Sequence, residues 1–540
     1  MEASQIYFVA KNGNDNNPGT ETQPWKTLTK AGNTATAGDT IYIKQGTYNE
    51  QFSIQHSGTE NNPITFTTYQ NDEVIIDGTS IPLSWDGLIR IIDKSYITIK
   101  GLTIQNSQYF GIYSKYSSNN IKIENNQITN CQSSAIIIYP SSTGNPHHIY
   151  IYNNTIDTTC MNMNQESISL SNVNYFEITN NKVFNSYKEG IDVKSGCRNG
   201  IIQENEVSNH DPIRPCIYID AYEKDSYNII VERNIAYNNG QGICLATEKG
   251  GTLENIKVYN NIIYTKSNGL GIHRFTTSGS HQKKDIYIIN NIFHMLEDAT
   301  CIMLTDNEEH FTNLVVRNNI LSGTNYHIMT TNFNDYTNIH IDHNLFTATS
   351  NEYGTNYIKA DPKFKNPSNA DFQLQPDSPA IDQGSPQNAP TTDYNGITRP
   401  QGEQIDIGAY EYINNKIFLL NEKPSDNAIN VPNTIKNISI EVSSLNNDLL
   451  YWTIETQPNI GFSEGVITNG TIILPISNLD NSTRYSWIIR VTNGKQWNNE
   501  SFCFTTQKDK RLIYIINEYI QSILSKFPHF SNIVERLYYL

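Results

Sequence analysis

The chain has 540 residues, too many for one compact core, so its length predicts several domains or a repetitive fold. Charged residues make up only 17% of it and the net charge is −16, which excludes nucleic acid as a partner because the overall field repels polyanions. No stretch approaches the length of apolar sequence that spans a membrane, so no transmembrane segment is expected. Abundant Asn, Gly, Thr, Ser and Tyr favour strands and turns.

The N-terminal segment holds two motifs rich in polar residues. They are Tyr7-Phe-Val-Ala-Lys-Asn-Gly-Asn-Asp15 and, after Pro24-Trp25, Gly38-Asp-Thr-Ile-Tyr-Ile-Lys-Gln-Gly-Thr-Tyr48. The first five residues lack the basic and apolar regions of a signal peptide. If the protein is exported, we therefore expect its signal to be missing from this sequence.

A short pattern, apolar-x-apolar-x-Asn-Asn-x-apolar, repeats between residues 96 and 345. Its first full copy is Ile121-Lys-Ile-Glu-Asn-Asn-Gln-Ile128, and an earlier copy over residues 97–104 has Gly101 in place of the Asn. The last Asn of successive copies lies at positions 126, 154, 181, 205, 234, 261, 291, 319 and 344, with spacings of 24 to 30 residues. A period in this range indicates a solenoid.

Each copy alternates Ile or Val with polar residues over four or five positions, which is the period of a half-buried strand. A coil of about 27 residues made of short strands and turns suits a parallel β-helix, in which equivalent positions stack about 4.8 Å apart. The repeated Asn is then expected at one bend of every coil, where it tolerates left-handed backbone and its amide can form a stacked ladder. The seven cysteines show no C-x-x-C spacing and are expected to be mostly buried thiols.

Two further motifs, Asp393-Tyr-Asn-Gly-Ile-Thr-Arg-Pro400 and Asp406-Ile-Gly-Ala-Tyr-Glu-Tyr412, follow the repeats. Together with the N-terminal motifs they resemble the ends of secreted right-handed parallel β-helix proteins related to family-9 pectate lyases and chondroitinase B-type lyases. The resemblance covers residues 5–412. It implies an all-β fold, a right-handed parallel β-helix solenoid, in an extracellular or cell-surface protein that we expect to be a monomer.

The pattern changes after Tyr412. Residues 415–507 alternate strands with a turn near residue 424 and contain the run Tyr485-Ser-Trp-Ile-Ile-Arg-Val491, which is similar to a small fibronectin type III-like β-sandwich. The tail, residues 508–540, is predicted to be an amphipathic helix. The apolar residues at helical spacing are Ile513, Ile516, Tyr519, Ile520, Ile523 and Leu524.

Strands of successive coils can be aligned on an Ile-x-Ile core over residues 166–170, 190–194, 216–220, 242–246 and 269–273. Alternation turns their apolar residues inward, so the residues between them point outward on one face. One column then holds Lys194, Asp220, Ala246 and His273, the next holds Asp192, Tyr218 and Cys244, and Tyr222 and Glu248 lie just beyond.

This face predicts a reaction site, because a random polar face would collect fewer ionisable residues on adjoining coils. The candidate catalytic residues are Lys194, Asp220, Tyr222, Glu248 and His273. The candidate substrate-binding residues are Arg198, Arg214, Tyr218 and Arg274, with Lys188 at the same rim. The candidate metal ligands, for calcium, are Glu189, Asp192 and Asp220. The arginines would supply the local positive charge that an acidic polysaccharide needs against the net charge. The alternative is a solvated strand face with a Lys194–Asp220 ion pair.

Two reactions fit these residues. In β-elimination of an acidic polysaccharide, Lys194 would remove the C5 proton, Asp192 and Asp220 would hold calcium or orient the site, and Tyr222 or His273 would protonate the leaving oxygen. In glycoside hydrolysis, Asp220 and Glu248 would be the two carboxylates and Lys194 would tune one pKa. We predict the lyase, with the hydrolase as the alternative.

Neither lyase pattern transfers intact. Chondroitinase B-like lyases use a Lys on one coil and an Arg on the next; Lys194 matches, but the stacked position is Asp220 and the nearest Arg is Arg214. Family-9 pectate lyases use an Asp cluster for calcium and a Lys on a later coil, where this chain offers His273 or Arg274.

A third possibility is a non-catalytic adhesion rod that binds glycans on exposed rows of Tyr and Asn, which the 33 tyrosines favour. A binder should spread its aromatic residues over many coils, whereas an enzyme concentrates ionisable residues on a few. The stretch from Glu189 to Arg274 concentrates them, which favours the enzyme.

Overall fold

The computed structural model describes residues 4–141, 144–238, 240–276, 278–306, 310–324, 326–330, 338–347, 354–413, 417–444, 449–494, 497–508, 518–519 and 522. The chain divides into two compact units, Met1–Tyr412 and Ile413–Leu540. The predicted C-terminal helix lies almost wholly outside the described residues. Within the described residues, no helix combines the length and the apolar character that crossing a bilayer requires.

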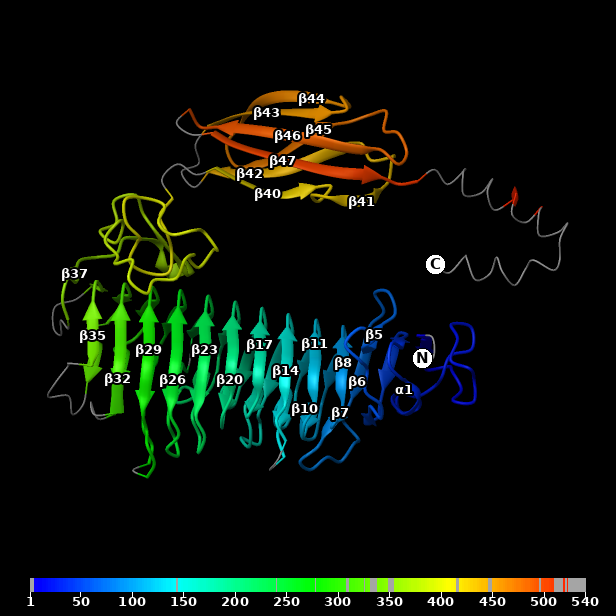
Figure 1. Cartoon of the computed structure of the whole chain (residues 1–540), viewed down its shortest axis with the longest axis horizontal. Helices are drawn as coiled ribbons and strands as arrows, with labels where there is room; N and C mark the ends of the chain where they lie inside the picture. The colour runs from blue at the N-terminus through cyan, green and yellow to red at the C-terminus, as the bar shows by residue number, and fades with distance from the viewer. Residues whose placement is uncertain are drawn as a thin grey trace. The chain divides into compact units, whose positions relative to one another are not determined.

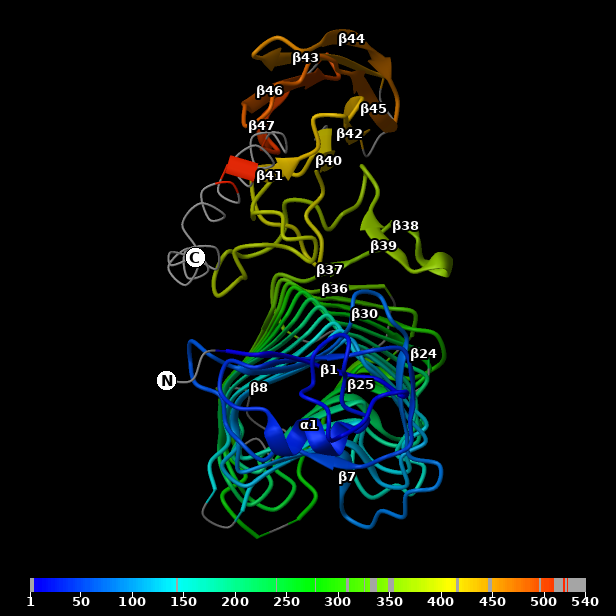
Figure 2. The ribbon, with the colours of Figure 1, turned by 90° about the vertical axis from the view of Figure 1, so that its right-hand side faces the viewer.

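The first unit is a parallel β-helix, as the repeat predicts (Figure 1). Nearly every coil contributes one strand to each of three sheets, which Figure 2 shows along the coil stack. Strands within each of these sheets pair in parallel, for example Asn119–Glu124 with His147–Tyr152. The alternating Ile and Val residues therefore recur at the same place in every coil and build one continuous core.

The bounds of the strands follow the chain through the three sheets, here named A, B and C. Sheet A contains β1 (Ile6–Val9), β2 (Thr40–Ile43), β5 (Ile64–Thr68), β8 (Ser95–Lys100), β11 (Asn119–Glu124), β14 (His147–Tyr152), β17 (Asn174–Thr179), β20 (Arg198–Gln203), β23 (Ser226–Glu232), β26 (Leu253–Tyr259), β29 (Lys283–Ile289), β32 (Phe311–Arg317) and β35 (Ile339–Asp342). Sheet B contains β3 (Gly46–Tyr48), β6 (Val74–Asp77), β9 (Thr103–Gln105), β12 (Gln127–Thr129), β15 (Thr155–Thr159), β18 (Lys182–Ser186), β21 (Glu206–Ser208), β24 (Ile235–Asn238), β27 (Ile262–Thr265), β30 (Ile292–Met295), β33 (Ile320–Ser322), β36 (Leu345–Phe346) and β37 (Ile358–Lys359). Sheet C contains β4 (Phe52–Ser53), β7 (Gly87–Ile92), β10 (Phe110–Lys115), β13 (Ile136–Tyr139), β16 (Ile168–Ser171), β19 (Ile191–Lys194), β22 (Pro215–Asp220), β25 (Gln241–Ala246), β28 (Leu270–His273), β31 (Thr300–Leu304) and β34 (Tyr326–Thr330).

A short helix, α1 (Leu28–Thr34), covers the N-terminal end of the coil stack (Figure 2). Its buried residues Leu28 and Ala31 belong to the solenoid core. A Cβ at Gly32 would lie 2.3 Å from the carbonyl oxygen of Ser53, so the helix approaches β4 at a distance that only glycine allows. The helix therefore shields apolar side chains that the first coil would otherwise leave exposed.

The repeated Asn forms the predicted ladder. Asn126 donates to Asn154 Oδ1 both from its backbone N–H and from its side-chain amide, each at 3.0 Å. The same two bonds recur in each following coil as far as Asn319 and Asn344. The amide of Asn154 also donates to the carbonyl oxygen of Ile123 at 2.9 Å, so both of its hydrogens and its oxygen have partners.

The two residues of each Asn-Asn pair have different tasks. The left-handed backbone belongs to the residue before the ladder Asn, such as Asn125 with a φ of 57°. In three later coils this first residue also binds the segment that follows the last coil: Asn260 donates to Thr392 O and Asn290 to Asp406 O. Arg399 returns a bond to Asn260 Oδ1 at 3.0 Å, so the terminal motif is fastened to the coils. This segment contains β38 (Phe364–Asn366), the 3₁₀ helix η2 (Pro367–Asn369) and β39 (Asp371–Leu374).

The second unit consists of two sheets that share one apolar core. The smaller sheet holds β40 (Ile417–Lys423), β42 (Asn437–Ser444) and β45 (Gly470–Pro475). The larger sheet holds β41 (Ala428–Val431), β47 (Trp497–Thr506), β46 (Arg484–Thr492), β43 (Leu450–Gln457) and β44 (Phe462–Ile467). Of the seven cysteines, all of them free thiols, six are buried in the first unit and Cys503 is half-buried in the second.

Candidate active site

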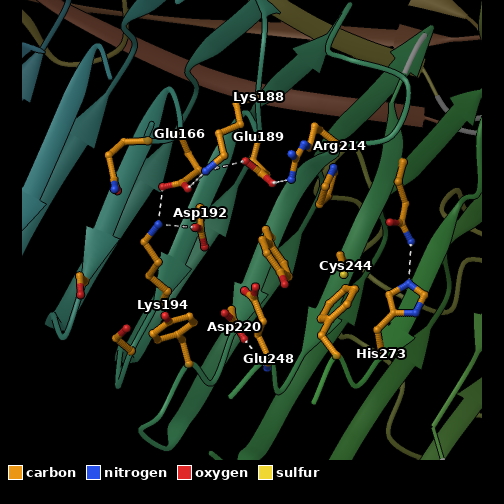
Figure 3. Close-up of a pocket in the computed structure, with 18 of the residues that line it drawn as sticks. Glu166, Lys188, Glu189, Asp192, Lys194, Arg214, Asp220, Cys244, Glu248 and His273 are labelled. Atoms are coloured by element: carbon orange, nitrogen blue, oxygen red, sulfur yellow. Dashed lines mark hydrogen bonds and ion pairs between the residues drawn. The ribbon is translucent and has the colours of Figure 1, made fainter. Parts of the chain in front are cut away.

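A cavity of about 690 Å³ lies on the outward side of sheet C, over β13 to β28 (Figure 3). The strand register pairs Lys194 with Asp220, Asp220 with Ala246, and Ala246 with His273, as the alignment of the coils predicts. The neighbouring column runs through Asp192, Tyr218 and Cys244. The inward residues between them, from Ile191 to Ile272, have no exposed surface. The repeat itself therefore brings these polar residues together.

Nine of the eleven residues named from the sequence line this cavity. They are Glu189, Asp192, Lys194, Arg214, Tyr218, Asp220, Tyr222, Glu248 and His273. Arg198 and Arg274 lie elsewhere. Arg198 is at the start of β20 on sheet A and donates to Asn145 Oδ1 at 2.8 Å, and Arg274 pairs with Asp306 at 3.4 Å.

Glu166, which the sequence analysis did not assign to the site, is the centre of a buried ionic cluster. Its carboxylate accepts hydrogen bonds from Lys194 and, at 2.7 Å, from Lys188. Lys194 also lies 3.0 Å from Asp192, and Arg214 lies 3.2 Å from Glu189. The Lys194–Asp220 ion pair of the alternative interpretation is not formed, because the ammonium group turns toward Glu166 and Asp192 (Figure 3).

Glu166 could have been found from the alignment. The backbone N–H of Ser167 donates to the carbonyl oxygen of Glu189 at 3.0 Å, so Glu166 stands opposite Glu189 one coil earlier. Glu166 already begins the first aligned range, and extending the second range back by one position to Glu189 would have placed both carboxylates at the same edge of the cavity.

The cluster fixes which of its groups carry charge. Burial works against the ionised form of Glu166, but the charges of Lys194 and Lys188 outweigh it and hold its pKa at about 2. Burial likewise works against the ammonium form of Lys194, yet Asp192 and Glu166 raise its pKa above the usual value. Burial raises the pKa of Asp192 well above its usual value, with Lys194 opposing and Glu166 and Glu189 adding to it. Lys194 is therefore protonated, and Glu166 balances its charge.

Asp220 is the carboxyl group with the clearest acid character. Its side chain is almost fully buried, and one oxygen accepts the backbone N–H of Glu248 at 3.0 Å. Burial raises the pKa of Asp220 to about 9, with that N–H opposing and the charges of Asp192 and Glu248 adding to the rise. Asp220 is therefore protonated at neutral pH, next to the half-buried side chain of Glu248.

The remaining candidates are less suited to proton transfer. Burial lowers the pKa of His273 to about 4, helped by the charge of Lys283, so its imidazole is neutral at neutral pH. Its ring is fixed by Thr305 at 2.6 Å and Gln241 at 3.2 Å. Burial raises the pKa of Tyr218 above its usual value. Tyr222 lies at the cavity wall with Lys249 4.4 Å above its ring.

The expected calcium ligands do not fit a calcium ion. Glu189 is paired with Arg214 and Asp192 with Lys194. Among the described residues, no group of three or more His, Cys, Asp or Glu side chains is arranged to hold a metal. Calcium prefers several converging oxygen ligands, whereas these two carboxylates are directed at a lysine and an arginine. No step of the reaction is therefore assigned to calcium.

Some buried polar atoms of the cavity have no hydrogen-bond partner within the protein. They are Glu189 Oε2, Asp192 Oδ1 and Arg214 Nε. Buried polar atoms are satisfied almost everywhere in folded proteins, so unsatisfied ones that face a cavity are available to a ligand. The polar wall over β19 and β22 can thus accept and donate hydrogen bonds to a bound molecule.

Two family models match the chain. A model described as "Pel9A-like, right handed beta helix region" matches residues 7–156, and one described as "Right handed beta helix region" matches residues 166–346. These matches show pectate lyase-like right-handed β-helix regions in the first unit. They agree with the resemblance inferred from the terminal motifs.

Curated proteins and solved structures give further similarities. The uncharacterised protein YwoF of Bacillus subtilis is 29% identical over 438 residues, which cover 69% of this chain and 91% of YwoF. The pectate lyase PEL9 of Emericella nidulans is 34% identical over 165 residues, which cover 26% of this chain and 40% of PEL9. The crystal structure of pectate lyase Pel9A is 14% identical, with a TM-score of 0.48 over 77% of this chain and 98% of that chain.

Proposed function

We propose that the protein is a glycoside hydrolase that cleaves a polysaccharide, with Asp220 as the general acid. The observation that carries the proposal is that Asp220 is almost fully buried beside a second acidic residue, Glu248, at the wall of a cavity, where burial raises the pKa of Asp220. Hydrolysis of a glycosidic bond needs such a pair, in which one group keeps its proton at neutral pH. The similarity to pectate lyases supports a carbohydrate substrate.

Glu248 is the second carboxylate of the proposal. In the free protein its charge helps to keep the proton on Asp220. When substrate binds, the glycosidic oxygen accepts that proton. Asp220 then protonates the leaving oxygen, and Glu248 takes a proton from the water that attacks the anomeric carbon.

β-Elimination is the second candidate, because the family model that matches residues 7–156 describes a Pel9A-like region. That match ends before Glu166, so it does not cover the candidate catalytic residues. A lyase with Lys194 as its base would need that lysine unprotonated, whereas Lys194 is protonated and held by Glu166 and Asp192. We therefore rank hydrolysis first.

The ion pairs that line the cavity bear on the charge of the substrate. Each cation that lines the cavity already has a carboxylate partner: Lys188 and Glu166 at 2.7 Å, Lys194 and Asp192 at 3.0 Å, Arg214 and Glu189 at 3.2 Å. An acidic chain would thus compete with existing pairs. We place the protein outside the cell, where polysaccharides occur.

We also propose that the second unit is a fibronectin type III-like module. Its smaller sheet has three strands and its larger sheet has five, and such sandwiches likewise pair a three-stranded sheet with a larger one. The hydroxyl of Tyr485, near the start of β46, accepts the backbone N–H of Asp480 at 2.8 Å, which resembles the tyrosine corner of these folds.

The test incubates the protein with acidic and neutral polysaccharides, such as polygalacturonate and xylan, with calcium or with a chelator. New reducing ends and the ultraviolet absorbance of unsaturated uronides are measured together. We expect reducing ends without absorbance, and a loss of about 10²- to 10⁴-fold in Asp220→Asn. Asp225→Asn, an exposed carboxylate after the same strand, is the matched control.

The outcomes separate the candidates. Absorbance that appears with the reducing ends would establish a lyase instead. Full activity of Asp220→Asn would overturn the assignment of the acid. Binding of a polysaccharide without any cleavage would favour the glycan-binding rod.

A further inference from the structure

A partly exposed aromatic cluster lies over sheet C, three to five coils before the proposed acid. We call it the aromatic platform; it consists of Trp85, Tyr109, Tyr116 and Tyr139, and Tyr109 and Tyr139 pack against the buried residues Phe110 and Tyr113. The indole ring of Trp85 is 39% exposed and its centroid lies 5.7 Å from Tyr109 and 5.9 Å from Tyr139. Buried Phe110 supports the cluster from below, with its centroid 5.6 Å from that of Trp85.

Tyr139 of the platform and the buried Tyr113 beside it stand in the same outward columns as the catalytic candidates. In the first column, Tyr113 pairs with Ile137, Ile137 with Ser169, and Ser169 with Asp192. In the second, Lys115 pairs with Tyr139. Tyr139 follows Ile138, the partner of Leu170, so it stands opposite Ser171, whose next partner is Lys194. Tyr139 is therefore three coils from Asp220, about 14 Å along the stack.

The cavity opens directly onto the platform. Tyr139 and Asn164 both line the cavity. The amide of Asn164 donates to the hydroxyl of Tyr109 at 3.2 Å, which joins the cavity wall to the platform. The ammonium group of Lys115 lies 4.8 Å above the ring of Tyr116 and 5.8 Å from that of Tyr113, so a donor is present among the rings.

We propose that the aromatic platform binds further sugar units of the same polysaccharide chain that is cleaved at Asp220. The chain then lies along the coil stack, with its cleaved bond over β22 and its next units over β13, β10 and β7. Aromatic faces pack against the apolar C–H faces of pyranose rings, and Lys115 and Asn164 donate to ring substituents. This inference rests on the proposed function, because it takes the cavity as the cleavage site.

The prediction is a dependence of affinity on chain length. A sugar dimer at Asp220 does not reach the platform, whereas an octamer covers both regions. Removing a platform ring should therefore weaken octamer binding and leave dimer binding unchanged. A ring that only stabilised the fold would affect both ligands alike.

The experiment measures dissociation constants by calorimetry on the full chain carrying Asp220→Asn, which binds without cleaving. Dimers and octamers of galacturonate and of xylose are the probes. We expect Trp85→Ala and Tyr139→Ala each to weaken octamer binding about tenfold. Tyr139→Phe keeps the ring and should bind like the parent.

Tyr175→Ala is the matched control, because Tyr175 is an exposed tyrosine on β17 of sheet A, away from the platform. Equal effects of Tyr175→Ala and Trp85→Ala, equal losses for dimer and octamer, or no binding of any probe would each overturn the proposal. Octamer binding that depends on Trp85 in a protein that cleaves nothing would keep the platform and refute the hydrolase. If cleavage depends on Asp220 but Trp85→Ala does not change octamer binding, the hydrolase is kept and the platform is refuted.

Discussion

The first unit contains two stacks of buried polar side chains that differ in one respect. In the ladder from Asn126 to Asn344, each interior amide uses both its hydrogens and its oxygen within the protein. In the cavity over sheet C, Glu189, Asp192 and Arg214 each keep a buried atom without a hydrogen-bond partner. Both stacks arise from the same coil repeat.

The difference separates structural from functional polarity. A buried amide whose hydrogen-bonding groups all have partners stabilises the fold and has no group left for a ligand. A buried polar group without a hydrogen-bond partner lowers the stability of the fold unless a ligand supplies the missing bond. Asp220 faces the same cavity, and its burial raises its pKa to about 9 and so prepares it to donate a proton. The following predictions test this contrast, from the largest effect to the smallest.

Breaking the ladder should have the largest effect on stability. Asn234→Ala removes the acceptor of two bonds from Asn205 and the donor to Ile202 O. Three buried groups then lack partners, so we expect the free energy of unfolding to fall by about 3–5 kcal/mol, measured by urea denaturation. Asn228→Gly, in the same coil, removes an exposed amide and keeps the backbone at its positive φ, so it should cost less than about 1 kcal/mol. Equal losses in both variants would refute the contrast between buried and exposed amides.

Breaking the ionic cluster around Glu166 should lower the free energy of unfolding somewhat less. Lys194→Met leaves Glu166 with only Lys188 as a cation and should lower the free energy of unfolding by about 3 kcal/mol. Adding Glu166→Gln removes the uncompensated charge, so the double variant should recover part of the loss. Thermal and urea unfolding of the two single variants and the double variant measure this coupling. Strictly additive losses would mean that the two side chains do not act as a pair.

The smallest effect, taken per unit of pH, is the contribution of Asp220 to the pH dependence of stability. Its folded pKa of about 9 lies above the unfolded value of 3.8, so the folded state binds the extra proton between these values. Its stabilising contribution is complete below pH 3.8 and is lost as the pH rises toward about 9. Between pH 5 and pH 8, wild type should therefore lose up to about 1.4 kcal/mol per pH unit relative to Asp220→Asn. Parallel stability curves of the two proteins would contradict a raised pKa.

The sequence predicts which residues of the site stack on one another better than it predicts the contacts of their side chains. The Asn spacing gives the coil, and the Ile-x-Ile alignment gives the columns through Lys194 and Asp220, because strand periodicity is local. It does not give the partners of Lys194, since register alone does not decide whether its side chain turns toward Glu166 and Asp192 or toward Asp220. It also places Arg198 and Arg274 at the site, although the first begins a strand of another sheet and the second turns toward Asp306.

The sequence by itself thus determined which residues stack from coil to coil, because a repeat of strands and bends repeats its hydrogen bonds as well. Only the tertiary structure decided which outward residues are buried. Asp192 and Asp220 point away from the core, yet both are almost fully buried. The turns around Asn164 and Arg214 line the cavity over them, and these turns follow no period that a sequence alignment could read.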